Sequence, residues 1–582
     1  MKIYRYKQAI AALFCLSTMA SCSDMLDTTS DMVEFVDDNT LSTPQDLQYS
    51  LMGIVRQMQV IADRTVLLGE VRADLMVPTP KATTAIKNMA AGDFTEDNPY
   101  NKISDFYAVI NSCNYYLANA DTTLVRLGKK VFEKEYAAVK AYRAWTYLQM
   151  AKIYGAVPLV TTPVLTENEA ELAMSAEKTD ITGICNYFID DLRKYIDTEF
   201  PQYEGVSQYI FIPVRVLMGE MCLWTGRYQE AATYLSQYLT MKGAPVITGM
   251  NKVEWAVNSQ NDDYGSAGIS TSFSPLFNGP STSEIFSYIP METSEFDGIA
   301  SRLADVYNST INNDYYFQIT PSATIREISA AQTHISTRWQ NNEVVAAWAA
   351  PKEGLYDDLQ KGDLRLCDVY NKYTENRSET SQYSSEVQTI RKFSSVNYVT
   401  IYRRQEVYLL FAEALCRAGY PESAFCILRY GLRATNIKKY ICEKERERAG
   451  ILLSFDDEIF PKLTTQGVHA IGCGGVAEEK INGPDGTTKV DNDYYVLPVP
   501  PEEMSYEDSV QYMIPRVEDL IMQERVLELA FEGRRYYDLM RVAMRRNDNS
   551  YLATPISMRT GTKDEEVYNQ LLDNKNWYLP LK

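Results

Sequence analysis

Three glutamates near the C-terminal end have the spacing that most readily suggests chemistry. Glu524, Glu528 and Glu532 follow one another at intervals of four, so a helix would place them on one face. Paired carboxylates can serve as acid and base in glycoside hydrolysis. The arginines that accompany them are Arg525, Arg534 and Arg535. Because guanidinium groups pair with carboxylates through two hydrogen bonds, we favour a structural role, in which these pairs lock the last helices and their turn, over a catalytic one.

Cys22 is the second residue with a specific chemistry. Three basic residues within the first seven positions precede an apolar run over residues 9–20, which is too short to span a bilayer as a helix. The sequence MASC at 19–22 then places small residues directly before the cysteine, as in a bacterial lipoprotein signal, although Met19 stands where leucine is usual. We expect acylation of Cys22 after cleavage, which would anchor the protein without a spanning helix. An ordinary secretory signal with a chance cysteine is the alternative.

The remaining composition weighs against several function classes. The net charge is −20, whereas a nucleic-acid partner requires a basic surface. Only two histidines are present, His334 and His469, so neither a histidine-rich metal site nor a histidine-based triad is expected. The other cysteines form no CxxC pair and are typical of small buried hydrophobes. We expect no cofactor and no catalytic residue, and the sequence leaves open whether a structural metal is bound.

Two helical hairpins are the clearest elements that could position these groups. In residues 404–432, apolar and small residues recur at helical spacing, and Gly419 ends the first helix because it can adopt the left-handed cap conformation. Pro421 then opens the second helix. The same pattern occurs in residues 215–239, where Gly226 aligns with Gly419. The pattern resembles the tetratricopeptide repeat, in which small residues let paired helices cross closely, with any antiparallel helix pair as the alternative.

The rest of the chain divides by composition and periodicity. The expected regions are a signal peptide at 1–21, a polar tether at 22–42, a helical region at 43–240, an irregular aromatic-rich insertion at 241–400, and a second helical region at 401–582 interrupted by an irregular stretch at 440–515. Outside the two hairpins, the helices predicted from apolar periodicity and end signals lie at about 43–64, 101–119, 131–154, 179–196 and 515–545.

Taken together, these segments resemble the SusD/RagB family of outer-membrane nutrient-binding lipoproteins of Bacteroidetes. The stretches that carry the resemblance are CSDMLD at 22–27, the helix that contains residues 107–114, YGAVPL at 154–159, the helix within 402–419, and QERVLELAFEGRRYYDL at 523–539. The last stretch is the most specific, and the order is kept over nearly the whole chain. The acidic residues after the lipidated cysteine also resemble the surface-export signal of such lipoproteins, with a plain acidic tether as the alternative.

The resemblance implies a mainly α fold, with about four tetratricopeptide-like hairpins in the core and an irregular, partly β insertion lobe. It also implies a lid-like lipoprotein on the extracellular side of the outer membrane. Such a protein captures oligosaccharides, or alternatively peptides, for a SusC-like TonB-dependent transporter. Two rival functions stay open from the residues themselves: a surface glycoside hydrolase and a purely structural assembly scaffold.

Ligand contacts have no residue-level motif, so they are predicted from chemistry and from zone. Sugar rings present apolar C–H faces on which aromatic side chains stack, while Asn, Asp and Arg bond the hydroxyl groups. The resemblance implies that loops in an early zone and in the insertion carry the site. The aromatic residues that we predict to contact ligand in these two zones are Phe94, Tyr100, Tyr315, Tyr316, Trp339 and Trp348.

Overall fold

The structure is a computed structural model. It describes residues 41–94, 98–126, 128–241, 253–256, 268–271, 284–292, 298–307, 318–332, 334–340, 343–350, 363–376, 384–390, 392–393, 397–456, 466–472, 481–482, 488–489 and 496–581. Within these ranges, no helix combines the length and the apolar character needed to cross a bilayer. The predicted signal peptide, the lipidated Cys22 and most of the tether lie outside the described residues.

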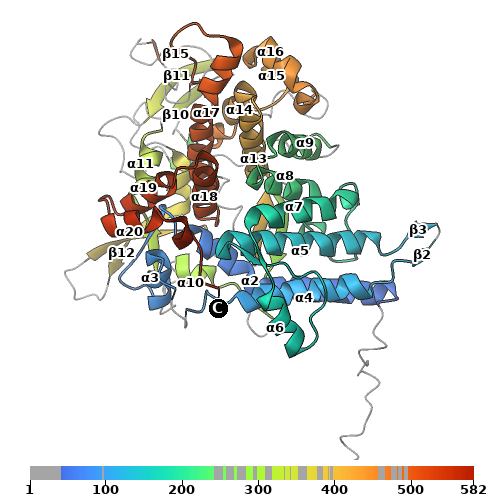
Figure 1. The fold of residues 1–582 in the computed structure, drawn as a ribbon. Helices are drawn as coiled ribbons and strands as arrows, with labels where there is room; N and C mark the ends of the chain where they lie inside the picture. Colours follow the sequence, from blue (N-terminus) through green and yellow to red (C-terminus); the bar gives the residue numbers. More distant parts are fainter. Residues whose placement is uncertain are drawn as a thin grey trace, which may run out of the picture.

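A stack of helices forms the body of the protein and rises from α4 at the bottom of Figure 1 to α14 near its top. Its members are α2 (Pro44–Glu70), α4 (Ile103–Asn119), α5 (Glu133–Tyr154), α7 (Ile181–Leu192), α8 (Val214–Trp224), α9 (Tyr228–Leu239), α13 (Arg404–Arg417), α14 (Pro421–Arg429), α17 (Tyr506–Leu529) and α18 (Arg535–Arg546). From α4 onward, each helix packs on the next through α5, α7, α8, α9 and α13, and α13 packs on both α14 and α17. The predicted mainly α fold, with its helical hairpins, is confirmed.

The two hairpins predicted from the glycine pattern are present. Gly226 and Gly419 both have positive φ, at 74° and 95°, and each stands at a turn between paired helices. Close crossing explains the small residue in α8, because a Cβ on Gly219 would lie 2.7 Å from Cγ of Leu235 on α9. Pro421 is the first residue of α14, as expected from its fixed φ.

The first and last parts of the chain meet where α2 crosses the turn before α18. Gly69 of α2 lies against Gly533, so that a Cβ on Gly69 would be 2.0 Å from the Gly533 carbonyl oxygen. Glu70 then caps α18 from outside, since its Oε1 accepts hydrogen bonds from the backbone N–H groups of Gly533 and Arg534, both at 3.0 Å. These N–H groups have no partner within their own helix. Glu70, at the end of α2, therefore provides the hydrogen-bond acceptor at the start of α18.

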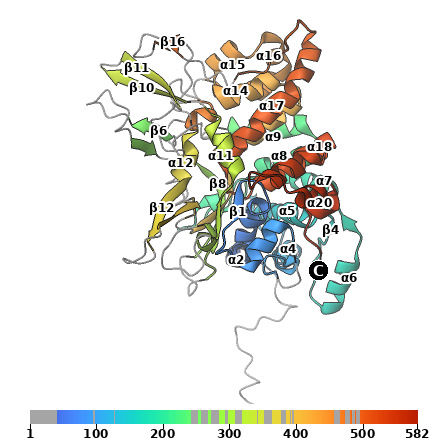
Figure 2. The same ribbon diagram turned by 90° about the vertical axis from the view of Figure 1, so that its left-hand side faces the viewer.

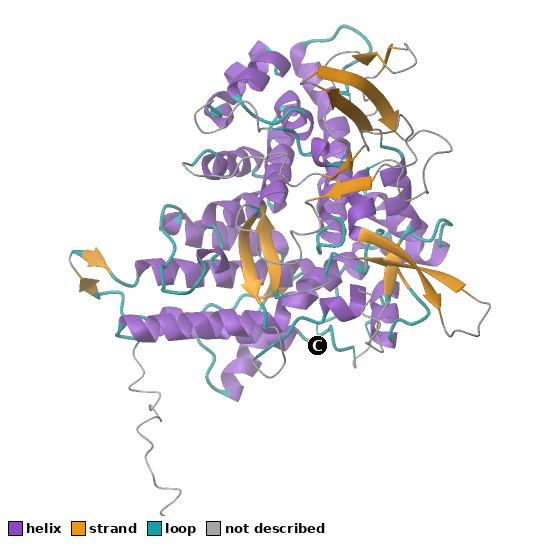
Figure 3. Cartoon of the chain, turned by 180° about the vertical axis from the view of Figure 1, so that it is seen from behind, coloured by secondary structure: helices purple, strands orange, loops and turns teal. Residues whose placement is uncertain are grey.

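Most strands lie along one side of the stack, as Figures 2 and 3 show, whereas the strands at 125–126 and 129–130 project beyond α4 and α5 on the opposite side in Figure 1. The described strands pair only in twos, all antiparallel: β1 (Met76–Pro78) with β9 (Ile319–Pro321), β2 (Val125–Arg126) with β3 (Lys129–Lys130), β4 (Val157–Pro158) with β5 (Lys178–Thr179), β6 (Val253–Ala256) with β7 (Gly268–Thr271), β8 (Ile285–Pro290) with β14 (Tyr398–Arg403), β10 (His334–Gln340) with β11 (Glu343–Ala350), β12 (Tyr370–Asn376) with β13 (Ser384–Ile390), and β15 (Ile481–Asn482) with β16 (Thr488–Lys489). The remaining α-helices are α3 (Thr84–Ala91), α6 (Glu167–Ser175), α10 (Leu303–Tyr307), α11 (Ala323–Ala330), α12 (Leu364–Val369), α15 (Ala434–Tyr440), α16 (Glu443–Ala449), α19 (Ser550–Met558) and α20 (Glu565–Leu571).

The start of α17 differs from the prediction. The helix begins at Tyr506, capped by the Ser505 hydroxyl, and Pro515 lies inside it instead of opening it. A proline inside a helix removes one backbone hydrogen bond. Val510, Met513 and Ile514 are nevertheless buried around it, so tertiary packing outweighs the local preference.

Replacing Gly69 by alanine should destabilise the protein, because the new methyl group would overlap the Gly533 carbonyl and force α2 away from the turn. We expect a loss of about 1–3 kcal/mol in the free energy of unfolding. Gly53→Ala is the matched control on the same helix, since a Cβ there meets nothing within 4 Å; it should be neutral or stabilising by up to about 1 kcal/mol. Melting temperatures and denaturant titrations of both variants measure the difference, and equal stability of the two would disprove the close contact.

Candidate functional site

The three glutamates predicted to share a helix face stand at the centre of a buried network of ion pairs. Glu524 and Glu528 share a face of α17 as predicted, but the prediction is wrong for Glu532, because α17 ends at Leu529 and Glu532 lies in the turn before α18. Glu524 and Glu528 have no solvent exposure, and Glu532 is 7% exposed. Their cationic partners come from α12, from β14 and from the turn that precedes β14. The network therefore joins the C-terminal helices to the insertion.

Arg365 enters the network from α12. Its guanidinium group donates to Glu524 Oε1 at 2.8 Å and to Glu528 Oε2 at 2.7 Å. The same group pairs with both carboxylate oxygens of Asp363, at 3.0 and 2.8 Å. His469 completes this half of the network, with Nδ1 lying 2.7 Å from Glu524 Oε2. All these side chains are buried, so each charge is compensated within the protein.

Arg403, the last residue of β14, supplies the other half. It forms a two-bond pair with Glu532, at 2.7 and 2.8 Å, and a further bond to Glu528 Oε1 at 2.6 Å. Lys392 Nζ lies 2.5 Å from Glu532 Oε1 and also donates to the carbonyl of Ala530 at 2.9 Å. Glu528 is thus shared between Arg365 and Arg403.

This environment keeps the carboxylates charged and inaccessible. Burial alone would raise the pKa of Glu524, but Arg365 and His469 lower it further, to about 2. Burial is likewise outweighed at Glu532, where Arg403 and Lys392 hold the pKa at about 2. A general acid needs a proton near neutral pH and contact with its substrate. Glu524 and Glu532 lack such a proton, and all three glutamates form ion pairs that join the last helices to other elements, so the structural role predicted for the cluster is confirmed.

The three arginines of the same sequence stretch also hold elements together. Their partners lie on α18, on α13 and just after α2: Arg525 with Asp538 at 2.7 Å, Arg534 with Glu406 at 2.6 Å, and Arg535 with Asp74 at 2.7 Å. These pairs tie the last helices to the middle and to the beginning of the chain.

Polar residues of α4 also have a positioning role. Asn114 Nδ2 donates to the carbonyls of Val160 and Thr162, at 3.0 and 3.1 Å. The Tyr107 hydroxyl donates to the carbonyl of Pro158 at 2.8 Å. Side chains thereby satisfy the backbone of residues 158–162, which outside the β4 and β5 pairing has no neighbouring strand among the described residues.

The two zones predicted to carry the ligand site lie side by side. Antiparallel pairing of β1 with β9 joins the early zone to the insertion. Gln318 extends the junction, because its carbonyl accepts from the Thr79 N–H at 2.8 Å and its side-chain oxygen from the Thr83 N–H at 3.1 Å. Its amide nitrogen donates to the carbonyl of Asp305 at 3.2 Å. Backbone contacts therefore fix the early loop against the insertion before any ligand binds.

A polar cluster occupies this junction, and we call it the Asp63 cluster: Asp63, Tyr100, Ser301, Arg302 and Asp305. Asp63 accepts from the Ser301 hydroxyl at 2.7 Å and from the Arg302 N–H at 2.6 Å. Burial raises the pKa of Asp63 to about 6 despite these bonds. Burial and the nearby carboxylates of Asp63 and Asp305 raise the pKa of Tyr100 to about 12, so its hydroxyl remains a donor. The Arg302 side chain is 65% exposed and pairs with Asp305 at 3.1 Å.

Of the six aromatic residues predicted to contact ligand, four are described, and their chain segments lie in separate parts of the molecule. Phe94 is 9% exposed, with the Arg72 guanidinium 5.6 Å from its ring centre, and Tyr100 is half-buried at the junction. Trp339 and Trp348 belong to the β10–β11 hairpin, opposite Val344 and Ser336 respectively. This hairpin lies near β15 in Figure 1 and near β16 in Figure 2. It is at the far end of the insertion from α2 and β1. Tyr315 and Tyr316 lie outside the described residues.

Sequence reasoning missed the other members of the Asp63 cluster. Asp63 lies on a helix, and Ser301, Arg302 and Asp305 lie more than 200 positions further along the chain. Common polar residues at such separation carry no local signal. Across the described residues, no group of three His, Cys, Asp or Glu side chains is arranged to hold a metal ion.

Two surface cavities of similar size lie elsewhere, and neither is lined by any of the six aromatic residues. One, of about 400 Å³, lies beside α8 and α9 and is lined by Phe200, Arg215 and Tyr238 among others. The other, of about 410 Å³, lies between α4 and α6 and is mainly apolar, with Ile110 and Met174 in its lining.

Glu528→Gln should strongly destabilise the protein at neutral pH, because it leaves the buried Arg365 and Arg403 without their shared counter-charge. Removing one partner of a buried pair costs about 3–5 kcal/mol. Glu565→Gln is the control, since its pair with Lys563 is exposed and such pairs contribute about 0–1 kcal/mol. Thermal and denaturant unfolding compare the two, and a Glu528 variant as stable as the control would contradict the network.

Acid should remove the contribution of Glu532. Its pKa is about 2 in the folded protein against an ordinary value of 4.5, so the stability it adds is complete above about pH 4.5 and is lost as the pH falls toward 2. The difference in melting temperature between wild type and Glu532→Gln should therefore narrow over this window. A difference that stays constant from pH 6 to pH 3 would show that Glu532 is not the titrating group.

Comparison with known proteins supports the resemblance on which the site prediction rests. Residues 332–582 match the family model described as "SusD family". Among solved structures, B. fragilis NanU is similar over 92% of this chain and 95% of its own, with 17% identity and a TM-score of 0.53. A SusD-like carbohydrate binding protein from Bacteroides fragilis NCTC 9343 covers 87% and 88%, at 16% identity and 0.51, and a SusD superfamily protein from Bacteroides thetaiotaomicron VPI-5482 covers 92% and 94%, at 17% and 0.51. No curated protein matches. Together, the family match over residues 332–582 and the fold shared with SusD-like structures support the SusD/RagB family for this chain.

Proposed function

We propose that this protein is a lipoprotein, anchored through Cys22 on the extracellular side of the outer membrane, that binds oligosaccharides and delivers them to a TonB-dependent transporter. The match of residues 332–582 to the SusD family model supports a nutrient-binding role. One solved structure with the same fold is described as a SusD-like carbohydrate binding protein. The observation that carries the proposal is the junction of β1 and β9, which holds a polar cluster where the two predicted ligand zones meet.

The Asp63 cluster has the chemistry that sugar hydroxyl groups require. Arg302 presents an exposed planar donor, Tyr100 keeps its proton, and Asp305 offers an acceptor beside them. Because the junction is held by backbone hydrogen bonds, these groups are positioned in advance, which lowers the entropy lost on binding. We place the oligosaccharide over this cluster.

Hydrolysis is not supported as an alternative. The carboxylate row that could have supplied an acid and a base is sealed by Arg365 and Arg403. Binding without cleavage is therefore the proposed activity. Peptides remain a second ligand class to be tested, since arginine and carboxylate groups also bond peptide backbone.

Arg302→Ala should weaken oligosaccharide binding roughly tenfold, the effect of losing one hydrogen bond from a charged donor, without changing the melting temperature. Arg193→Ala is the matched control, because Arg193 is also exposed and also pairs with an aspartate three positions away. A glycan and peptide array would first identify a ligand for wild type, and calorimetric titration would then compare the variants. Equal affinities for all three proteins would show that the ligand does not bind at this cluster. Release of cleaved product by the wild type would refute binding without cleavage.

Cys22→Ala should release the protein from the outer membrane, because the thiol that accepts the lipid is missing. Expressed in a Bacteroidetes host and labelled with an alkyne fatty acid, the wild type should carry the label and fractionate with outer membranes. The variant should carry none. A labelled, membrane-bound Cys22→Ala protein would place the anchor elsewhere. Cys15→Ala serves as the control and should behave as wild type.

A further inference from the structure

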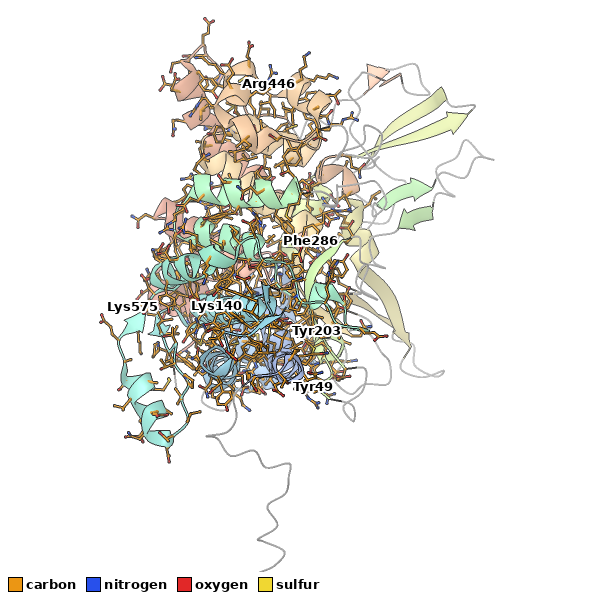
Figure 4. All side chains as sticks on the ribbon, turned by 90° about the vertical axis from the view of Figure 1, so that its right-hand side faces the viewer. Tyr49, Lys140, Tyr203, Phe286, Arg446 and Lys575 are labelled. Atoms are coloured by element: carbon orange, nitrogen blue, oxygen red, sulfur yellow. The ribbon has the colours of Figure 1, made fainter. Side chains whose placement is uncertain are left out.

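The arm between β4 and β5 is the one part of the described N-terminal helical region whose helix buries no residue. It contains α6, which projects from the body below α4 in Figure 1 and stands clear of it in Figure 4. Three large apolar side chains of the arm are exposed to water: Leu165 by 59%, Leu172 by 63% and Met174 by 42%. Grouped exposed apolar side chains are typical of surfaces that bind another molecule.

A groove beneath this helix adds to the apolar surface. The cavity of about 410 Å³ between α4 and α6 is lined by Ile110, Val164, Ala173 and other mostly apolar groups. Its amides are already used: Asn111 donates to the Val164 carbonyl at 2.8 Å and accepts from the Val164 N–H at 2.7 Å. What the groove offers to a partner is therefore chiefly apolar contact.

The arm is also held in a defined shape without burying its own helix. The pairing of β4 with β5 closes its base. A capping box between Thr166 and Glu169 fixes the start of α6, with Glu169 also accepting from the Leu165 N–H at 2.7 Å. A preorganised surface loses less entropy on binding than a flexible one.

Charge identifies the kind of partner. Residues 165–177 contain four glutamates, at 167, 169, 171 and 177, and no lysine or arginine. An acidic rim around an apolar centre complements apolar side chains flanked by lysine or arginine. The same charge disfavours an anionic lipid surface, which binds basic segments.

We infer that the α6 arm is a docking element for a protein segment with apolar side chains and basic flanks, and that this segment belongs to the transporter. The assignment of the segment to the transporter rests on the function proposed above. Leu172 supplies the central contact, and the glutamates of the arm orient the partner.

Co-purification from outer membranes tests this inference on the full lipidated protein. Affinity-tagged wild type should capture the TonB-dependent transporter, and Leu172→Glu should lower the amount captured at least fivefold. Ile451→Glu is the control, because Ile451 is 81% exposed and lies beside α16 at the opposite end of the stack. Both variants should keep the wild-type melting temperature, since each changes an exposed side chain.

Photo-crosslinking gives a second readout that does not depend on a substitution that weakens binding. A photoreactive residue at position 172 should form an adduct with the transporter, and one at position 451 should not. Undiminished capture by Leu172→Glu, or an adduct from 172 with a second copy or with lipid only, overturns the docking element while leaving the proposed function intact. If wild type captures no transporter at all, the proposed function fails with it.

Discussion

Buried charge is stable in a protein only when its counter-charge is buried with it, and this constraint holds the present fold together. Glu524, Glu528 and Glu532 lie in the interior of the last helices, where each would be costly alone. Arg365 and Arg403 reach them from α12 and β14. If the insertion separated from the helical stack, buried carboxylates and guanidinium groups would lose their counter-charges.

That coupling has a bearing on ligand binding. In the Asp63 cluster, Asp63 belongs to α2, whereas Ser301 and Arg302 belong to the insertion. The geometry of the cluster therefore depends on how the insertion is attached to the helical stack. The ion pairs of Glu524, Glu528 and Glu532 are made with Arg365, Lys392 and Arg403, and they hold the insertion in place. The charges that hold the scaffold together and the groups proposed to bind ligand are thus different residues.

Much of the stack could be predicted because its signals are local. Gly419 ends a helix and Pro421 starts one, and both follow from the backbone preferences of a single residue. Partners of buried charges could not be predicted in the same way. Nothing near Arg365 in the sequence points to Glu524, which lies 159 positions away. The carboxylate spacing predicted a shared helix face for Glu524 and Glu528, but their cationic partners can be identified only in the folded structure.

The zones of the proposed ligand site can be compared with the structure, whereas the six aromatic contacts remain predictions. The early loop and the insertion do meet, through β1 and β9. Within them, Phe94 is mostly buried and the β10–β11 hairpin lies far from the junction. An aromatic side chain that packs in a core and one that stacks on a ligand look alike in a sequence, because both meet an apolar surface. Exposure separates them, and it depends on tertiary neighbours.

The contact of Gly69 with Gly533, and the cap that Glu70 provides for α18, also set an order on biogenesis. α2 is among the first helices to leave the ribosome, and the turn it packs against is among the last. This contact and this cap can therefore form only when synthesis is nearly finished, after most of the helices have been made.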